Sequence, residues 1–148
     1  YAREMLSAEV RLIDGVGETL ACLSQSHPLM LITKGDPSEQ LRKIEDSGLG
    51  VFFRWVEVVA DKSPAAYRAI LERYNIPASR FLMVGNSLRS DIAPVLELGG
   101  WGVHVPYHTT WAHEADATLR HGGERMRTIA GIADLAQAVQ ELDAIASR

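Results

Sequence analysis

The stretch that decides the fold is FLMVGNSLRSDI, which spans residues 81–92. It begins as a short apolar run, passes through Gly85, Asn86 and Ser87, and continues with apolar residues at helical spacing. A short apolar run bounded by turn formers is typical of a buried strand. The stretch therefore predicts a strand, a polar turn and a helix, in that order.

The same succession of strand, turn and helix is predicted on both sides of this stretch. Apolar runs indicate strands at 29–33, 55–59, 81–84 and 102–105, and helical spacing indicates helices at 4–21, 38–46, 64–74, 88–98 and 132–145. Ser63 and Pro64 are residue types of an N-cap and a first helical position. Strands that alternate with helices predict a parallel sheet covered on both faces. We therefore expect an α/β fold, a three-layer Rossmann-like sheet, with 107–127 mainly as a loop.

The composition narrows the class of protein. The chain has 148 residues, of which 47% are hydrophobic, and a formal net charge of −4, which fits one globular domain. The acidic balance offers no electrostatic footprint for nucleic acid or an anionic membrane, and no apolar run approaches the ~20 residues of a membrane span. Cys22, the sole cysteine, excludes an intrachain disulfide and suits a reducing compartment, so we expect a cytoplasmic protein. Its apolar helical neighbourhood predicts a core position for Cys22.

Residues that suit phosphoryl chemistry follow the predicted strands. In parallel sheets ligands bind at the carboxyl ends of the strands, so these positions decide what the fold binds. Thr33 offers a hydroxyl, and the turn that begins with Lys34 and Gly35 offers backbone N–H groups to a phosphate. Lys62 precedes a helix and offers a compact positive charge to a phosphoryl group or a carboxylate. Each residue also has a local interpretation, as a cap, a turn residue or a solvated lysine.

Oxygen ligands follow the strand at 81–84. Asn86 and Asp91 present an amide and a carboxylate oxygen five positions apart. A hard cation such as Mg²⁺ takes ligands of this kind together with water and phosphate. The hydroxyl, the lysine and these oxygens together predict metal-assisted phosphoryl chemistry, with an ordinary Asn-Ser turn as the local alternative.

The order of these motifs resembles that of the haloacid dehalogenase-like (HAD) hydrolase superfamily. The segment 31–35 matches its second motif, 62–64 its third and 83–92 its fourth, and 15–20 is similar to the loop and helix before the second motif. The resemblance covers residues 14–105, and the fourth motif is its most specific part. It implies that residues 1–148 form part of a HAD-like hydrolase core.

The resemblance implies roles for the residues of the second and third motifs. Thr33 would hydrogen-bond the transferred phosphoryl group, with Lys34 and Gly35 beside the substrate. Lys62 would stabilise negative charge on the nucleophile and on the phosphoryl group. The implied reaction is hydrolysis of a small phosphate monoester, a phosphorylated metabolite, through an aspartyl-phosphate intermediate.

The resemblance also implies a Mg²⁺ site in the fourth motif. Asn86 and Asp91 would hold the ion, and Ser87 would support them by hydrogen bonds. The superfamily usually has an aspartate where this chain has Asn86. An amide oxygen brings no charge, so we expect the metal affinity to be lower unless Asp91 and acidic residues elsewhere compensate.

The aspartate nucleophile of the superfamily's first motif has no clear counterpart in the sequence. The internal candidate, Asp14, lies 19 positions before Thr33. A βαβ unit takes about 30 residues or more, so this spacing argues against Asp14. We therefore expect the nucleophile, its strand and any cap domain upstream of Tyr1, in a missing N-terminal segment or a companion chain.

Two other functions stay open at this point. One is an inactive HAD-like or receiver-like binding module without turnover, and the other is a HAD hydrolase that cleaves carbon–halogen bonds. A receiver has its acidic pair before its threonine and lysine, whereas Thr33 and Lys62 precede Asn86 and Asp91 here. The order of the residues therefore disfavours the receiver.

Four histidines cluster in the last third of the chain, at His104, His108, His113 and His121. Their spacing is too irregular for an ordinary structural zinc site, which pairs closely spaced ligands. We expect them in a polar loop near the mouth of the active site.

Overall fold

The computed structural model describes residues 16–106 and 123–147, and the chain divides into two compact units, Tyr1–Asp61 and Lys62–Arg148. The predictions for Asp14, for the helix before residue 16 and for His108, His113 and His121 lie outside the described residues. Among the helices of the described ranges, none combines the length and apolar character that crossing a membrane requires.

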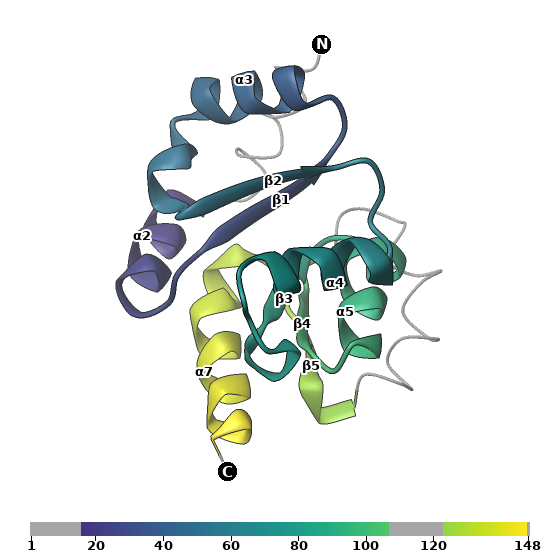
Figure 1. The fold of residues 1–148 in the computed structure, drawn as a ribbon. Helices are drawn as coiled ribbons and strands as arrows, with labels where there is room; N and C mark the ends of the chain where they lie inside the picture. Colours follow the sequence, from purple (N-terminus) through teal and green to yellow (C-terminus); the bar gives the residue numbers. More distant parts are fainter. Residues whose placement is uncertain (1–15, 107–122, 148) are drawn as a thin grey trace. The chain divides into compact units, whose positions relative to one another are not determined.

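The first unit is built around a pair of parallel strands (Figure 1). Its elements are helix α2 (Val16–Ser26), strand β1 (Met30–Lys34), helix α3 (Pro37–Ser47), the 3₁₀ turn η1 (Leu49–Phe52) and strand β2 (Trp55–Val59). β1 pairs with β2 in a register that runs from Met30↔Trp55 to Lys34↔Val59. The predicted strands at 29–33 and 55–59 and the predicted helix at 38–46 are confirmed within a residue or two.

Local residue chemistry explains where α3 begins and ends. Asp36 is the N-cap, its carboxylate accepts the N–H of Glu39 at 3.0 Å, and Pro37 takes the first helical position. At the other end Gly48 has a φ of 72°, the left-handed conformation that commonly terminates helices. The segment after β1 is therefore set by its own sequence as a turn into a helix.

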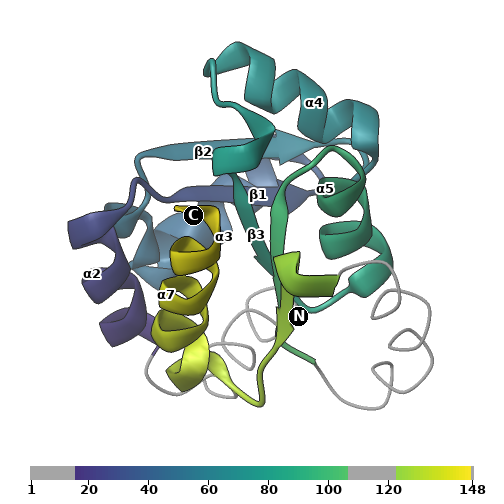
Figure 2. The same cartoon turned by 90° about the horizontal axis from the view of Figure 1, so that it is seen from below.

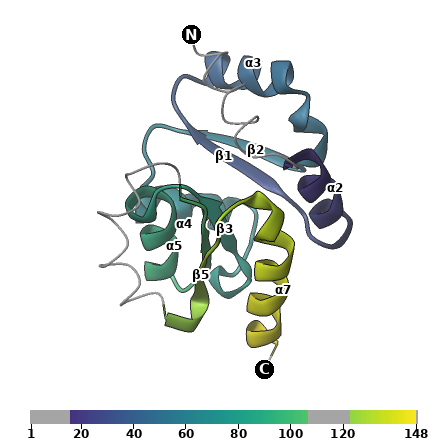
Figure 3. The ribbon, with the colours of Figure 1, turned by 180° about the vertical axis from the view of Figure 1, so that it is seen from behind.

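The second unit holds a sheet of three parallel strands in the order β3-β4-β5. The strands are β3 (Leu82–Gly85), β4 (Trp101–His104) and β5 (Met126–Thr128), and the helices are α4 (Pro64–Arg73), the π-helix η3 (Leu88–Ile92), α5 (Ala93–Glu97) and α7 (Leu135–Ala146). Short 3₁₀ turns complete it: η2 (Ala78–Arg80), η4 (Gly123–Arg125) and η5 (Ile132–Asp134). α5 and α7 cover opposite faces of this sheet (Figures 1, 2 and 3). The predicted parallel α/β fold is confirmed.

The core of the second unit lies where the π-helix and α5 pack onto the sheet. Leu88, Ile92, Leu96 and Met126 form one buried apolar cluster. A Cβ atom at Gly102 would lie 2.6 Å from Cγ2 of Ile92, so the glycine lets the π-helix approach β4 closely. This close packing fixes the position of the turn that connects β3 to the π-helix.

Several predictions about individual segments are wrong. The stretch 88–98, predicted as one helix, is a π-helix followed by the short helix α5. β5 begins at the end of the stretch 107–127 that was predicted mainly as a loop, and its three residues pair with β4. Cys22 is exposed, because α2 turns its neighbour Leu23 inward instead. His104 is a fully buried residue of β4, which confirms the strand predicted at 102–105, so the expectation that grouped it with the other histidines in a polar loop is wrong.

Candidate active site

A buried carboxylate lies at the carboxyl end of β3. Asp91 is only 2% exposed, and its Oδ1 accepts a hydrogen bond from Nζ of Lys62 at 2.7 Å. Its Oδ2 accepts the backbone N–H of Ser87 at 3.1 Å. The side chain of Lys62 is 21% exposed, so the ammonium group covers the carboxylate on its solvent side. The structure thus brings together two predicted site residues that are 29 positions apart in the sequence.

Gly85 makes room for this carboxylate. A Cβ atom at position 85 would overlap Oδ2 of Asp91 and lie 2.5 Å from its Cγ. The carboxylate of Asp91 therefore lies directly against the main chain of Gly85, the last residue of β3. The glycine of the fourth motif is required by this close approach rather than by an unusual backbone angle.

The π-helix places Asp91 where its carboxylate reaches Lys62 and the backbone of the turn after β3. Ser87 caps it, with its Oγ accepting the N–H of Ser90 at 3.1 Å, and the N–H of Ile92 reaches back five residues to the carbonyl of Ser87. In an α-helical register, the carbonyl of residue 90 would accept the N–H of residue 94. That residue is Pro94, which has no N–H to give.

Tyr67 supplies the donor that Pro94 lacks. Its hydroxyl donates to the carbonyl of Ser90 at 2.9 Å, across 23 positions of sequence, and the residue is 1% exposed. Burial, and then the negative charge of Asp91, raise the pKa of the Tyr67 phenol. The hydroxyl therefore stays protonated and keeps donating. The sequence analysis predicted the helix at 64–74 that contains Tyr67 but missed this role, although the proline four positions after Ser90 was a signal.

We expect Tyr67→Phe to lower the free energy of unfolding by about 1–3 kcal/mol at pH 8, because the Ser90 carbonyl loses its buried donor. The raised pKa sets the trend at alkaline pH. Above about pH 10 the phenol ionises in the unfolded chain before it does so in the folded one, so the wild type loses stability as pH rises. Urea titrations at pH 8 and pH 10.5 should show the gap between the two proteins shrinking. Equal stabilities at pH 8 would contradict this role.

In the first unit, Thr33 and Gly35 both contact Gln40. The hydroxyl of Thr33 donates to Oε1 of Gln40 at 3.0 Å. Gly35 has a φ of +142°, and a Cβ there would lie 2.8 Å from Nε2 of Gln40, while Lys34 is exposed. The sequence analysis did not single out Gln40, which lies one helical turn inside α3. These residues belong to the first unit, whereas Lys62, Asn86, Ser87 and Asp91 belong to the second.

The side chain of Asn86 is exposed, while its backbone is held from below. The carbonyl oxygen of Asn86 lies 3.1 Å from Nε2 of His104, and a carbonyl can only accept, so the histidine donates. His104 is 0% exposed. Asn86 thus stands at the surface of the turn, with its main chain tied to the core of the sheet.

The donor chemistry of this turn suits Mg²⁺. Asp91 and Asn86 offer hard oxygen donors, and each carboxylate oxygen of Asp91 has a further lone pair beyond the one used by Lys62 or Ser87. Within residues 16–106 and 123–147, no group of three or more His, Cys, Asp and Glu side chains gathers as a metal site. Asp91 and Asn86 could therefore hold a Mg²⁺ ion only as part of its ligand set, and Mg²⁺ commonly keeps several waters beside one or two protein ligands.

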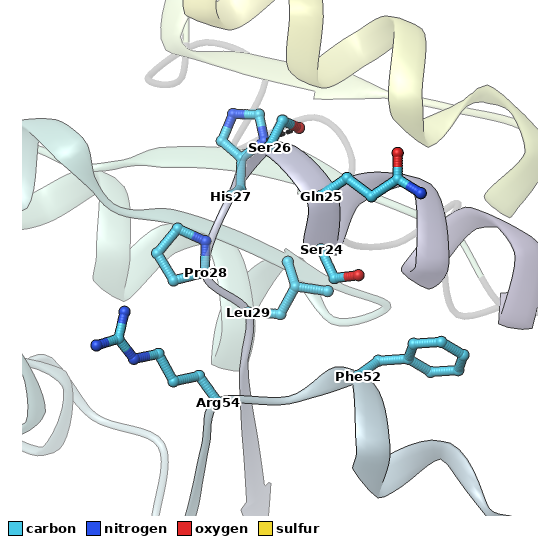
Figure 4. Close-up of a pocket in the computed structure, with 8 residues that line it drawn as sticks. All are labelled: Ser24, Gln25, Ser26, His27, Pro28, Leu29, Phe52 and Arg54. Atoms are coloured by element: carbon cyan, nitrogen blue, oxygen red, sulfur yellow. Dashed lines mark hydrogen bonds between the residues drawn. The ribbon is translucent and has the colours of Figure 1, made fainter.

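Two pockets lie away from this turn. One, of about 340 Å³, is lined by residues 24–29 with Phe52 and Arg54, at the amino ends of β1 and β2 (Figure 4). The guanidinium of Arg54 and the ring of Phe52 point in opposite directions there. The other, of about 380 Å³, lies in the second unit between the end of α4 and Leu98. Neither pocket contains a predicted site residue, and both lie at strand ends opposite to the carboxyl ends.

The lysine–aspartate pair and the Gly-Asn-Ser turn lie at the carboxyl end of a parallel α/β sheet, which is where folds of this class bind their ligands. The family model for haloacid dehalogenase-like hydrolases matches residues 1–99. The chain belongs to this family.

Comparisons with individual proteins support this family membership. The chain is 31% identical over 96 residues to the HAD-hydrolase YfnB of Bacillus subtilis, an alignment that covers 61% of this chain and 41% of YfnB. A solved haloacid dehalogenase-like hydrolase from Xanthomonas campestris is 42% identical, with a TM-score of 0.79 over 92% of this chain and 53% of that one. The solved structure of YfnB gives a TM-score of 0.67 at 23% identity, over 84% and 54% of the two chains. The chain thus spans about half the length of these relatives.

Proposed function

We propose that the protein hydrolyses a small phosphate monoester with the help of Mg²⁺, using Lys62 and Asp91 at the carboxyl end of β3. The observation that carries this proposal is the 2.7 Å pair between Lys62 and the buried Asp91, held under the turn 85–87. A fixed ammonium group beside oxygen donors is what a phosphoryl group with developing negative charge requires.

The reaction proceeds in two steps. In the first, a nucleophilic carboxylate that lies outside the described residues attacks phosphorus, the bond to the ester oxygen breaks, and the leaving alkoxide takes a proton from water. Water then attacks the same phosphorus, which releases phosphate and frees the carboxylate. Lys62 stabilises negative charge on the nucleophile and on the phosphoryl oxygens, and Asp91 orients Lys62. The hydroxyl of Thr33, which donates to Gln40 in the structure, would exchange this hydrogen bond for one to a phosphoryl oxygen.

We place the nucleophilic carboxylate outside the described residues. In the described part of the chain, β3 pairs with β4 on one side and with no strand on the other. A parallel strand on that open edge would bring a residue at its carboxyl end next to Gly85 and Asp91. This supports a nucleophile on a strand that docks beside β3.

Mg²⁺ would be held by Asp91 and Asn86, and when bound it would offset charge on the phosphoryl oxygens. The oxygen-only donor set of these two residues supports this choice of ion over zinc. The solved structure of YfnB is bound to magnesium, which supports the same choice.

The direct test is turnover of p-nitrophenyl phosphate by the full-length protein in the presence and absence of roughly millimolar Mg²⁺, followed by addition of EDTA. We expect hydrolysis that requires Mg²⁺, that EDTA abolishes and that excess Mg²⁺ restores. Absence of turnover for this substrate and for a panel of small phosphorylated metabolites would contradict the proposal and favour a binding module.

A hydrolase of carbon–halogen bonds is the second candidate. The observation in its favour is Asn86, which is uncharged at a position where a metal site would benefit from a carboxylate. Such an enzyme would release halide from a small 2-haloacid in the presence of EDTA. Halide release without phosphatase activity would establish this function in place of the first.

A further inference from the structure

His104 ends the pairing between β3 and β4 in an unusual way. The last main-chain bond between the two segments runs from the N–H of Val105 to the carbonyl of Gly85 at 2.9 Å. The next carbonyl along, that of Asn86, is taken by the side chain of His104 at 3.1 Å. The imidazole therefore extends the ladder by one bond, into the turn that precedes the π-helix.

The position of the ring follows from the strand. Residues 102 and 104 share one face of β4, because side chains alternate along a strand. On that face Gly102 lets Ile92 of the π-helix approach closely, and two residues further His104 lies under the start of the turn. β5 holds the strand from the other side, since the N–H of Ile129 donates to the carbonyl of His104 at 2.9 Å. The donor is thus fixed on both sides and fully excluded from solvent.

We propose that His104 is a positioning residue for the metal site, and that its hydrogen bond sets the place of Asn86. This inference rests on the proposed function, because it assumes that Mg²⁺ binds at Asn86 and Asp91. Asn86 is exposed and uncharged, so its amide oxygen contributes to metal binding only when its backbone is held in place. Asp91 is already held by Lys62 and Ser87, whereas the main-chain carbonyl of Asn86 accepts its hydrogen bond from His104.

The test compares Mg²⁺ binding with folding stability in three variants of the full chain. His104→Leu removes the donor, and His104→Gln restores an N–H at nearly the same reach. Val103→Ala is the matched control, because Val103 is also 0% exposed on β4 but lies on the opposite face of the strand. Dissociation constants come from Mg²⁺ titrations followed by the amide resonances of residues 86–91, and melting temperatures are measured without metal.

We expect His104→Leu to raise the dissociation constant for Mg²⁺ about 10–100-fold, the usual cost of losing a group that orients a metal ligand. His104→Gln should recover most of the affinity. Val103→Ala should lower the melting temperature while leaving the dissociation constant within about twofold of wild type. In the wild type, NMR should show a proton on Nε2 of His104, because this is the ring nitrogen that donates to the carbonyl of Asn86.

Four outcomes would overturn the inference. If wild type and His104→Leu bind Mg²⁺ equally, or if Val103→Ala weakens binding as much as His104→Leu does, His104 has only a structural role. If His104→Leu does not fold, a folded His104→Asn variant, whose amide is shorter, takes its place. His104→Gln and His104→Asn would then have to differ in their affinity for Mg²⁺, and equal dissociation constants would show that His104 has only a structural role. If the wild type shows no Mg²⁺ binding at residues 86–91, the metal part of the proposed function fails and this inference fails with it.

Discussion

Replacing Lys62 with alanine is expected to lower kcat for phosphate-ester hydrolysis about 10²–10³-fold, the range found when one preorganised donor is removed from a charged transition state. Lys62 is held at 2.7 Å from Asp91, so its ammonium group is in place before substrate arrives. Its loss removes that charge and also leaves Asp91 as a buried carboxylate without a cation. We therefore expect a lower free energy of unfolding as well, by an amount that solvent access to the lysine reduces.

The measurement is steady-state turnover of p-nitrophenyl phosphate, with circular dichroism to show that the variant is folded. Lys43→Ala is the matched control, because Lys43 pairs with Glu39 at 3.6 Å on the surface of α3 and has no place in the site. The control should keep wild-type kcat and lose at most about 0.5 kcal/mol of stability. A folded Lys62→Ala protein with undiminished turnover would show that Lys62 is not part of the machinery.

Gly85→Ala is expected to disrupt the site through sterics alone. The added methyl group would overlap the Asp91 carboxylate, which is buried and hydrogen-bonded to Lys62 and Ser87. Relief requires Asp91 or the end of β3 to move. We expect a stability loss of about 1–3 kcal/mol from overpacking and a fall in kcat of about 10²-fold from a displacement near 1 Å.

Gly131→Ala provides the control for this substitution. Gly131 has an extended backbone with a φ of −162°, and a Cβ there would meet nothing within 4 Å. It should leave turnover unchanged and stability within about 0.5 kcal/mol of wild type. If Gly85→Ala behaves like Gly131→Ala in both turnover and urea unfolding, the contact between position 85 and Asp91 does not constrain the site.

Much of the fold could be read from local patterns. The apolar runs at 29–33 and 55–59 predicted β1 and β2, because buried parallel strands need continuous apolar residues. Ser63 and Pro64 predicted the start of α4, and the Ser63 hydroxyl does accept the N–H of Ala66 at 3.2 Å. Such signals act between residues that are near in sequence, so the sequence alone contains them.

Other features depend on residues far apart, and the sequence did not reveal them. The carbonyl of Ser90 accepts its hydrogen bond from Tyr67, and nothing local in the sequence says that α4 lies within reach of Ser90. Cys22 and Leu23 are neighbours on α2, and only the packing of the helix decides which one is buried. The strand that contains His104 was predicted, but its hydrogen bond to the carbonyl of Asn86 joins residues 18 positions apart, and no local pattern predicts it.

By itself, the sequence determined the class of fold, the succession of strands and helices, and the residue types at the carboxyl ends of the strands. Periodicity and capping are local, and an unfolded chain already carries them. The tertiary structure alone decided that Lys62 meets Asp91, that Gly85 must be small, and that Tyr67 and His104 hold the turn between them. These contacts join separate elements, and they exist only once the second unit has packed its helices onto its sheet.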